Sequence, residues 1–172
     1  MFGTDLNRNW SYRWGGHGNV SREPRSDAYR GKRPFSAPET RALRDFVKSR
    51  MIGGAQQIKA AIDFHSAAEL VLWPYGYTTA NTAKGMTDKQ YARLARLGRV
   101  MAHANGYKGE QASDLYIAPG ELPDWLWGEY GIYAYTFELG PGEEFYPAEF
   151  ADEIARNREP VLLLLDAATR LP

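Results

Sequence analysis

Two short apolar runs in the middle of the chain have the length and composition of strands. The first extends from Ile58 to Phe64 with little interruption, and the second from Leu70 to Trp73. A nearly continuous apolar run is typical of a strand covered on both faces, whereas a half-covered strand alternates apolar and polar residues. We therefore expect a first strand buried on both faces and a second strand after a brief break that contains His65.

A capping box predicts a helix before these strands. Ser36 is followed three residues later by Glu39, the pattern in which each side chain bonds the other residue's backbone N–H. The helical period then brings three apolar residues to one face, namely Leu43, Phe46 and Val47. We expect this helix to begin at Ser36 and to end near Met51, before two glycines.

A second capping box predicts another helix after the strands. Thr87 is followed three residues later by Gln90, and Gly106 stands where a left-handed C-cap is expected. The apolar side of this helix consists of Tyr91, Leu94, Leu97 and Met101. Its other side is rich in basic residues and should face solvent.

The C-terminal third predicts one more strand and one more helix. Residues 132–139 are rich in aromatic and β-branched types, which favours a strand ending around Glu138. Residues 147–171 predict a terminal helix, kinked or broken at Pro160. Strands that alternate with helices indicate an α/β fold with a mixed, largely parallel sheet flanked by helices, in which ligands gather at the carboxyl ends of strands. Both His65 and Glu138 fall at such ends.

Composition indicates one ordinary globular domain and excludes several classes of partner. The 172 residues are 44% hydrophobic and 24% charged, which suits a single domain spanning 1–172. The formal net charge is zero and no basic stripe is evident, so nucleic acid is not an expected partner. No apolar stretch approaches the roughly 20 residues that span a bilayer, so a membrane is not expected either. The absence of cysteine excludes disulfides and thiolate ligands.

Two residues carry candidate chemistry, although each has a structural alternative when taken alone. A single His after a strand, such as His65, is more often a hydrogen-bonded structural residue than a metal ligand. Glu138 is equally well explained as a carboxylate that emerges from the sheet. The neighbouring motifs decide between these alternatives.

Four segments, in this order and spacing, resemble the zinc metallocarboxypeptidase family of the carboxypeptidase A and carboxypeptidase T type. They are Gly3-Thr4-Asp5-Leu6-Asn7-Arg8-Asn9-Trp10, then Phe64-His65-Ser66 with Leu72-Trp73-Pro74-Tyr75-Gly76, then Tyr116 with Asp124-Trp125, and finally Thr136-Phe137-Glu138-Leu139. The resemblance runs from Asp5 to about Leu139 and corresponds to the C-terminal half of the family's catalytic domain. It implies a zinc-dependent hydrolase that removes C-terminal amino acids from peptides.

The resemblance implies a role for each matched residue. Arg8 would bind the C-terminal carboxylate of a peptide through its planar guanidinium, and Asn7 would add an amide hydrogen bond to the same group. Tyr116 resembles the tyrosine that closes over bound substrate, although a tyrosine in this loop could also serve packing. His65 would be a ligand of Zn²⁺, and Glu138 would be the general base.

The other two zinc ligands of the family come from an upstream His-x-x-Glu motif that this sequence does not contain. A catalytic zinc site needs about three protein ligands, and His65 is the one expected here. The family's aspartate at the position of Asp5 orients the upstream zinc histidine, a partner that this sequence does not supply. We therefore expect an incomplete catalytic domain, a truncated form of a longer protein, that is inactive alone.

The identity of the preferred C-terminal residue follows from the same resemblance. The position that most often decides this preference corresponds to Pro123, next to Leu122, which favours an apolar or aromatic residue. Glu121 lies close enough to admit basic side chains as well. Two alternatives stay open: a non-catalytic module that binds peptide or sugar, and a related zinc amidase that acts on peptidoglycan peptides. The family resemblance also favours a secreted monomer, although the first residues of this chain are not a signal peptide.

Overall fold

A four-stranded mixed sheet forms the centre of the molecule. The computed structural model describes residues 3–142 and 150–171. The strands are β3 (Ala60–His65), β4 (Leu70–Trp73), β5 (Lys108–Gln111) and β6 (Tyr133–Glu138), in the spatial order β3-β6-β4-β5. The pairs β3 with β6 and β4 with β5 are parallel, and β4 with β6 is antiparallel. The predicted α/β fold with a mixed, largely parallel sheet is confirmed.

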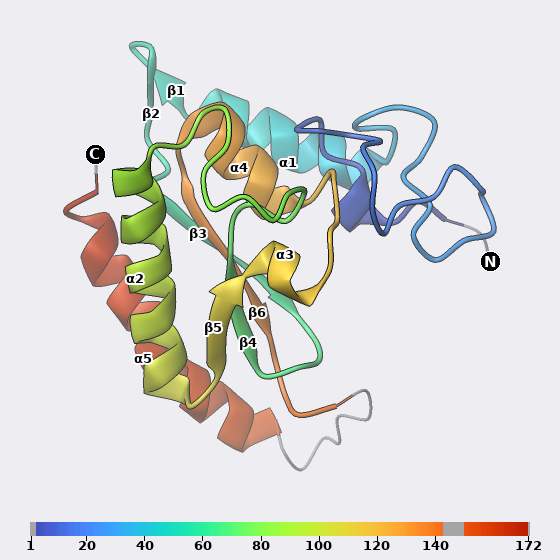
Figure 1. The fold of residues 1–172 in the computed structure, drawn as a ribbon. Coiled ribbons are helices and arrows are strands. Elements are labelled where there is room, and N and C mark those ends of the chain that lie inside the picture. Colours follow the sequence, from blue (N-terminus) through green and yellow to red (C-terminus); the bar gives the residue numbers. More distant parts are fainter. Residues whose placement is uncertain (1–2, 143–149, 172) are drawn as a thin grey trace.

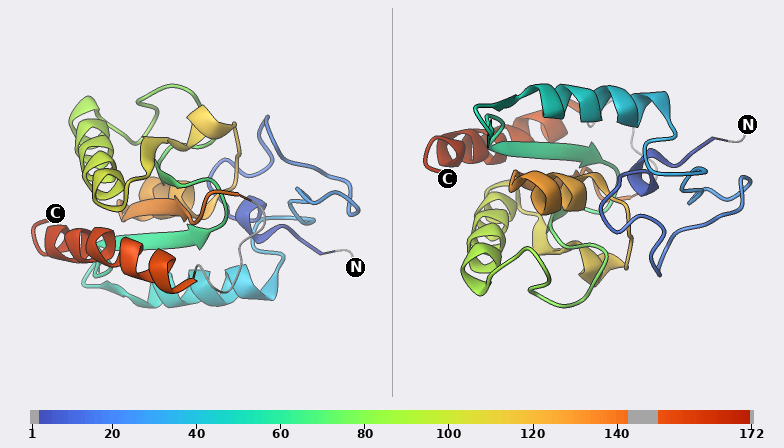
Figure 2. Two further views of the ribbon diagram at one scale, coloured as in Figure 1. Left: turned by 90° about the horizontal axis from the view of Figure 1, so that it is seen from below. Right: turned by 90° about the horizontal axis from the view of Figure 1, so that it is seen from above.

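Helices and a small hairpin surround this sheet (Figure 1). The helices are α1 (Pro38–Ser49), α2 (Asp88–Asn105), α3 (Ala112–Leu115), α4 (Leu122–Tyr130) and α5 (Phe150–Ala168), with a 3-10 turn η1 at Leu6–Arg8. The hairpin consists of β1 (Met51–Ile52) and β2 (Ala55–Gln56). Figure 2 shows α1 and α2 on opposite sides of the molecule, with the sheet between them.

Helix α2 begins and ends where its local sequence predicts. The Thr87 hydroxyl accepts a hydrogen bond from the Gln90 backbone, the Gln90 side chain bonds back to Thr87, and Gly106 closes the helix with a φ of 73°. Gly98 lies against the sheet, and a Cβ there would meet the Trp73 ring at 2.5 Å. The lack of a side chain at this position therefore allows the helix to approach the sheet closely.

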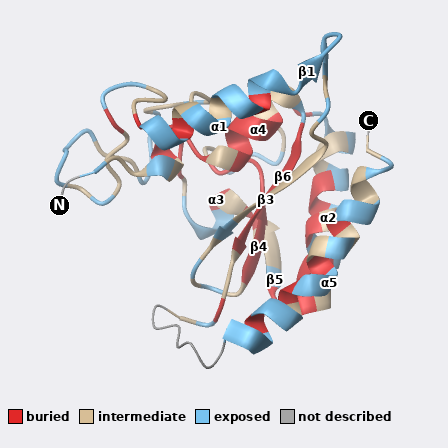
Figure 3. Cartoon of the chain, turned by 180° about the vertical axis from the view of Figure 1, so that it is seen from behind, coloured by how far each residue is buried: buried red, intermediate tan, exposed pale blue. Residues whose placement is uncertain are grey.

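The core occupies the inner faces of the sheet and of the helices packed on it. Buried residues are concentrated in β4, β6, α2 and α4, whereas β3 is mostly half-buried (Figure 3). One cluster joins β4, β6 and α2 and includes Val71, Trp73, Leu94, Met101, Tyr135 and Phe137. A second cluster beneath α4 includes Trp10, Val47, Trp125, Ile132 and Ala134.

The predicted N-cap of α1 is wrong, and two of the three apolar residues on its predicted face are exposed. The N-cap is Ala37, without a capping side chain, and the helix opens with Pro38, which suits the first helical position. The Ser36 hydroxyl instead accepts a hydrogen bond from the buried Asn9 side chain. On the helix itself Val47 is buried, but Leu43 and Phe46 are 36% and 53% exposed. The helix ends at Ser49, because residues 51–56 form the hairpin.

Two further expectations about the elements need correction. Strand β3 is not buried on both faces, because most of its residues are half-buried and Phe64 is 52% exposed. Within the described residues it lies at the edge of the sheet and pairs with β6. Helix α5 continues through Pro160, which lies inside it and is buried, so a break there is wrong, while a kink stays a prediction. Packing of α5 against α2 stabilises the helix despite the hydrogen bond that proline removes. The predicted start of this helix at Pro147 lies outside the described residues. No helix in the described ranges is long and apolar enough to cross a membrane.

Candidate active site at the carboxyl ends of β3 and β6

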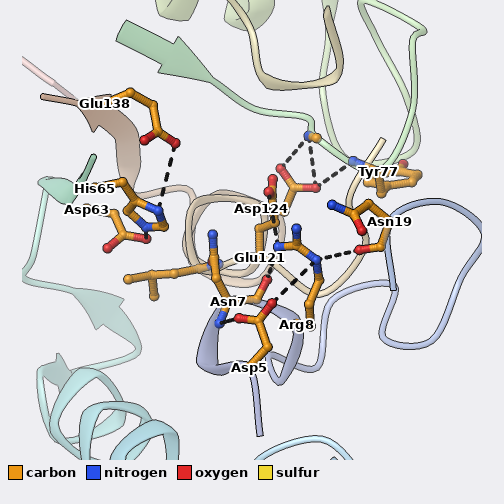
Figure 4. Close-up of polar contacts among 12 residues, drawn as sticks. Asp5, Asn7, Arg8, Asn19, Asp63, His65, Tyr77, Glu121, Asp124 and Glu138 are labelled. Atoms are coloured by element: carbon orange, nitrogen blue, oxygen red, sulfur yellow. Dashed lines mark hydrogen bonds and ion pairs between the residues drawn. The ribbon is translucent and has the colours of Figure 1, made fainter. Parts of the chain in front are cut away.

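The parallel pairing of β3 and β6 brings His65 and Glu138 together. They are direct partners in the strand register, each at the carboxyl end of its strand, so both side chains leave the sheet on the same side. The His65 Nδ1 atom lies 3.8 Å from the Glu138 Oε1 atom. The other ring nitrogen, Nε2, lies 2.9 Å from the Asp63 Oδ2 atom (Figure 4). The imidazole therefore lies between two carboxylates.

Both residues have perturbed pKa values. The pKa of His65 is raised, chiefly by its hydrogen bond to Asp63, with smaller contributions from the charges of Asp63, Glu138 and Asp5, while burial opposes the shift. The pKa of Glu138 is also raised, chiefly by burial and further by Asp63, while His65 lowers it. Burial disfavours the charged form of a carboxyl group and so makes the carboxylate a stronger base.

The turn η1 positions Asp5, Asn7 and Arg8. Asp5 is its N-cap, and its Oδ1 accepts a hydrogen bond of 2.9 Å from the Asn7 backbone N–H. The Asn7 side-chain oxygen accepts a hydrogen bond from the Leu122 backbone at 2.9 Å. An amide oxygen that is already bonded in this way leaves the NH₂ group of the same side chain as the donor for a ligand.

The Arg8 guanidinium is held by backbone carbonyls in a buried position. Arg8 is only 4% exposed, its Nε donates to the Asn19 carbonyl at 2.6 Å, and its Nη1 donates to the Asn7 carbonyl at 2.8 Å. Among the residues that the structure describes, no hydrogen bond or ion pair uses Nη2. The group is therefore fixed in orientation while it retains donors for an incoming carboxylate.

Tyr116 lies beside this cation at the surface. It follows α3 as the C-cap, is 43% exposed, and its ring centroid lies 5.6 Å from the Arg8 guanidinium carbon. A ring at this distance makes a cation–π contact with the guanidinium.

Two buried carboxyl groups, Glu121 and Asp124, lie on the other side of Arg8. Asp124 accepts backbone hydrogen bonds from Gly76 and Tyr77 at 2.9 to 3.1 Å, and burial raises its pKa to about 7. The Glu121 Oε1 atom lies 3.7 Å from the Arg8 Nη1 atom. Burial and the nearby Asp124 raise the pKa of Glu121 well above its ordinary value, while Arg8 opposes the shift.

A pocket of about 390 Å³ connects parts of this region. It is lined by residues from η1, β3, α1 and the start of α4, among them Asp5, Asn7, Asp63, His65 and Leu122. Residues that are far apart in sequence thus share one cavity. The structure brings together the sequence-predicted residues Asp5, Asn7, Arg8 and Tyr116 around η1, and His65 with Glu138 at the strand ends.

The residues of this site suit one ligand position of a metal ion. Because Nε2 of His65 faces Asp63, a neutral imidazole carries its proton there and leaves the Nδ1 lone pair free on the side of Glu138. Within residues 3–142 and 150–171, no group of three or more His, Cys, Asp or Glu side chains is arranged to hold a metal ion. His65 is therefore compatible with zinc as one ligand, and this part of the chain does not form a full ligand set.

The sequence interpretation assigned no role to Asp63; it considered Glu121 only for substrate preference and quoted Asp124 only as part of a family motif. The signal for Asp63 was its place two residues before His65, which puts both side chains on the same side of a strand. No comparable signal identifies the burial of Glu121 and Asp124, because it results from packing against residues distant in sequence.

Comparison with known proteins gives a consistent picture. The family model described as zinc carboxypeptidase matches residues 1–160. The chain is 43% identical to a zinc carboxypeptidase of Saccharothrix mutabilis subsp. capreolus, over 99% of this chain and 40% of that relative. It is 37% identical to carboxypeptidase A1 of Rattus norvegicus, over 80% of this chain and 32% of the relative. The chain thus spans well under half the length of these relatives.

A solved structure shares the fold. Bovine thrombin-activatable fibrinolysis inhibitor, in complex with a tick carboxypeptidase inhibitor, superposes with a TM-score of 0.83 at 26% identity. The similarity covers 98% of this chain and 57% of the other.

Proposed function

The chain belongs to the zinc carboxypeptidase family, and we propose that it supplies the carboxylate-binding residues, the general base and one metal ligand of a site that removes C-terminal residues from peptides. In this proposal residues 1–172 form the C-terminal part of a single catalytic domain. The observation that carries it is the buried Arg8 guanidinium, which is fixed by two backbone carbonyls beside Asn7 and Tyr116.

A fixed guanidinium selects a terminal carboxylate over an internal peptide carbonyl. Arg8 donates hydrogen bonds from Nε and Nη1 within the described structure, so Nη2 is the donor left for substrate. The Asn7 amide adds a second donor and Tyr116 a phenol, each a neutral partner for the same group. An internal peptide bond has no negative charge to pair with Arg8, so we expect removal of terminal residues rather than internal cleavage.

The proposed chemistry belongs to His65 and Glu138. A zinc ion, when bound, polarises the scissile carbonyl and lowers the pKa of a bound water. His65 would hold the ion through Nδ1, with further ligands from outside the described residues. Glu138 would take a proton on Oε1 from the attacking water and pass it to the leaving amine.

We propose a preference for apolar C-terminal residues. Pro123 and Leu122 are apolar, and the acid beside them, Glu121, has a raised pKa that favours its neutral form. A neutral acid attracts a Lys or Arg side chain much less than a carboxylate would. Secretion, expected from the family, is part of the same proposal.

Binding to a matched pair of peptides tests the proposal without requiring catalysis. Titration calorimetry would compare a blocked dipeptide ending in phenylalanine with its C-terminal amide. We expect the free acid to bind and the amide to bind at least about 10-fold more weakly, since a hydrogen bond to a charged group contributes about 1.5–3 kcal/mol. Arg8→Gln should remove most of this difference, because glutamine has no positive charge to pair with the carboxylate.

The matched control is Arg96→Gln on the exposed face of α2, which removes a charge elsewhere and should leave both affinities unchanged. Equal binding of acid and amide to the unmodified chain would refute the carboxylate-binding role.

A second measurement separates the proposed peptidase from its two alternatives. The chain would be mixed with zinc and with the upstream part of the Saccharothrix relative. That relative is a suitable source because it is 43% identical to this chain where the two sequences align. Release of phenylalanine from the blocked dipeptide supports the peptidase. Binding without turnover in this mixture would favour a non-catalytic module, and turnover of peptidoglycan peptides alone would favour an amidase.

A further inference from the structure

Of the two carboxylates beside the His65 imidazole, Asp63 is the nearer, and none of the sequence motifs gives it a role. Its Oδ2 atom lies 2.9 Å from Nε2 of the imidazole. The two residues are separated by one position on β3, so their side chains leave the same side of the strand. Both are paired in register with β6, Asp63 with Thr136 and His65 with Glu138, which fixes the backbone at each position.

The two carboxylates beside His65 differ in their distance from the ring nitrogens. A neutral imidazole has a single N–H, and a carboxylate accepts hydrogen bonds without donating one. Asp63 is at hydrogen-bonding distance from Nε2, whereas the Glu138 oxygen, at 3.8 Å from Nδ1, is beyond that range. The proton is therefore more stable on Nε2, and Nδ1 presents its lone pair toward Glu138.

We propose that Asp63 is a positioning residue that holds His65 in the Nε2–H tautomer and fixes its ring, so that Nδ1 is available as a metal ligand beside Glu138. Carboxylate partners of this kind orient a ligating histidine, and their loss typically weakens metal affinity or activity by about 10- to 100-fold. The assignment of a metal ligand rests on the proposed function, but the tautomer and its dependence on Asp63 do not.

The neighbouring Asp5 distinguishes a hydrogen bond from a general effect of negative charge. Asp5 lines the same pocket as His65 and its charge acts on the imidazole. Its Oδ1 is already bonded to the Asn7 backbone, and no hydrogen bond joins it to His65 among the described residues. If the tautomer depends on the direct contact, replacing Asp63 must change it and replacing Asp5 must not.

Nitrogen NMR of the intact chain tests this inference directly. The sequence contains three histidines, so an imidazole ¹⁵N spectrum has few signals, and a His65→Gln variant assigns those of His65. At a pH of about 9, well above the ordinary pKa of histidine, the protonated and unprotonated ring nitrogens give separate signals. We expect the unmodified chain to show a protonated Nε2 with a slowly exchanging proton, and an unprotonated Nδ1.

The variants should separate the possible causes. In Asp63→Ala we expect loss of the slowly exchanging Nε2–H signal and a shift of both nitrogen signals toward those of interconverting tautomers. Asp63→Asn keeps an acceptor oxygen and should retain the Nε2–H tautomer with faster proton exchange. The control Asp5→Asn keeps a good N-cap residue and should leave the His65 signals as they are. The backbone amide ¹H–¹⁵N spectrum reports whether each variant stays folded, because the other two histidines, His17 and His103, are exposed and their ring signals say little about folding.

Either of two results would overturn the inference: an Nδ1–H tautomer in the unmodified chain, or unchanged His65 signals in folded Asp63→Ala. Addition of Zn²⁺ to the unmodified chain gives a separate readout of the proposed function. A selective shift of the Nδ1 signal supports His65 as a ligand. If that signal does not respond, the metal role fails while the tautomer result stands.

Discussion

Replacement of the buried Asp124 by asparagine should change how the stability of the protein depends on pH. Burial raises the pKa of Asp124 from 3.8 to about 7, so the folded protein binds one more proton at this site than the unfolded chain between these two values. A raised pKa of an acid contributes stability that is fully present below pH 3.8 and is lost as the pH rises through 7.

The size of this effect follows from the two pKa values. Stability falls by about 1.4 kcal/mol for each pH unit between them and levels off above the higher value. Between pH 5 and pH 8 the loss from Asp124 alone is about 2.5 kcal/mol. Asparagine does not titrate, so the Asp124→Asn variant should lack this slope.

At acidic pH the variant should be the less stable protein. Gly76 donates to both carboxyl oxygens and Tyr77 donates to Oδ2 alone, so whichever oxygen the amide NH₂ group replaces, a donor faces a backbone N–H. We expect this to cost about 1 kcal/mol. At pH 8 this deficit should be cancelled or reversed, because the unmodified protein must then hold a buried charge.

Urea denaturation followed by tryptophan fluorescence at pH 5 and at pH 8 measures the difference. The titration of groups that Asp124 does not influence cancels when the variant is compared with the unmodified chain at each pH. Glu121 does not cancel, because the charge of Asp124 raises its pKa, so Glu121→Gln is made in both proteins before they are compared. Asp27→Asn, at an exposed position, is the matched control and should leave the pH dependence unchanged. If the unfolding free energies of the unmodified chain and of Asp124→Asn depended on pH in the same way, the reasoning that burial raises the pKa of Asp124 would be refuted.

Three further changes have defined outcomes. Gly98→Ala should destabilise the chain by about 1–3 kcal/mol in thermal unfolding, although helix propensity alone favours alanine by about 1 kcal/mol, because the new methyl would meet the Trp73 ring at 2.5 Å. Asn9→Ala should lower the unfolding free energy in urea by about 3 kcal/mol or more, because the buried amide bonds five groups of the segment 30–40. Glu121→Gln, which mimics the neutral acid, should change the affinity for a phenylalanine-ended peptide by less than about twofold in calorimetry; a loss of about tenfold would show that Glu121 acts as a charged group.

Local signals in the sequence determined several elements of this protein. The capping box at Thr87 and the glycine at 106 define α2, because both act through hydrogen bonds to backbone only a few residues away. The apolar run Leu70–Trp73 is buried along its whole length, as a strand inside the sheet must be. The fold class followed from the alternation of such elements.

Other features depended on partners that are distant in sequence. Ser36 has the pattern of an N-cap, but Asn9 provides a competing hydrogen bond and the helix begins at Pro38. The run that ends at Phe64 has the composition of a strand buried on both faces, yet most of its strand is half-buried and Phe64 is exposed. The composition of a segment indicates how apolar it is, but it does not indicate how many other elements cover it.

The candidate site shows the same division. Sequence motifs identified His65 and Glu138 and placed both at strand ends, because strand ends follow from local composition. Only the tertiary structure decided that these two residues share one register position, and that Asp63 contacts Nε2 rather than leaving it to solvent. It also decided that Glu121 and Asp124 are buried near Arg8. Distances and burial arise from contacts between separate segments, so the charge and tautomer of each group were set by folding and not by its neighbours in the chain.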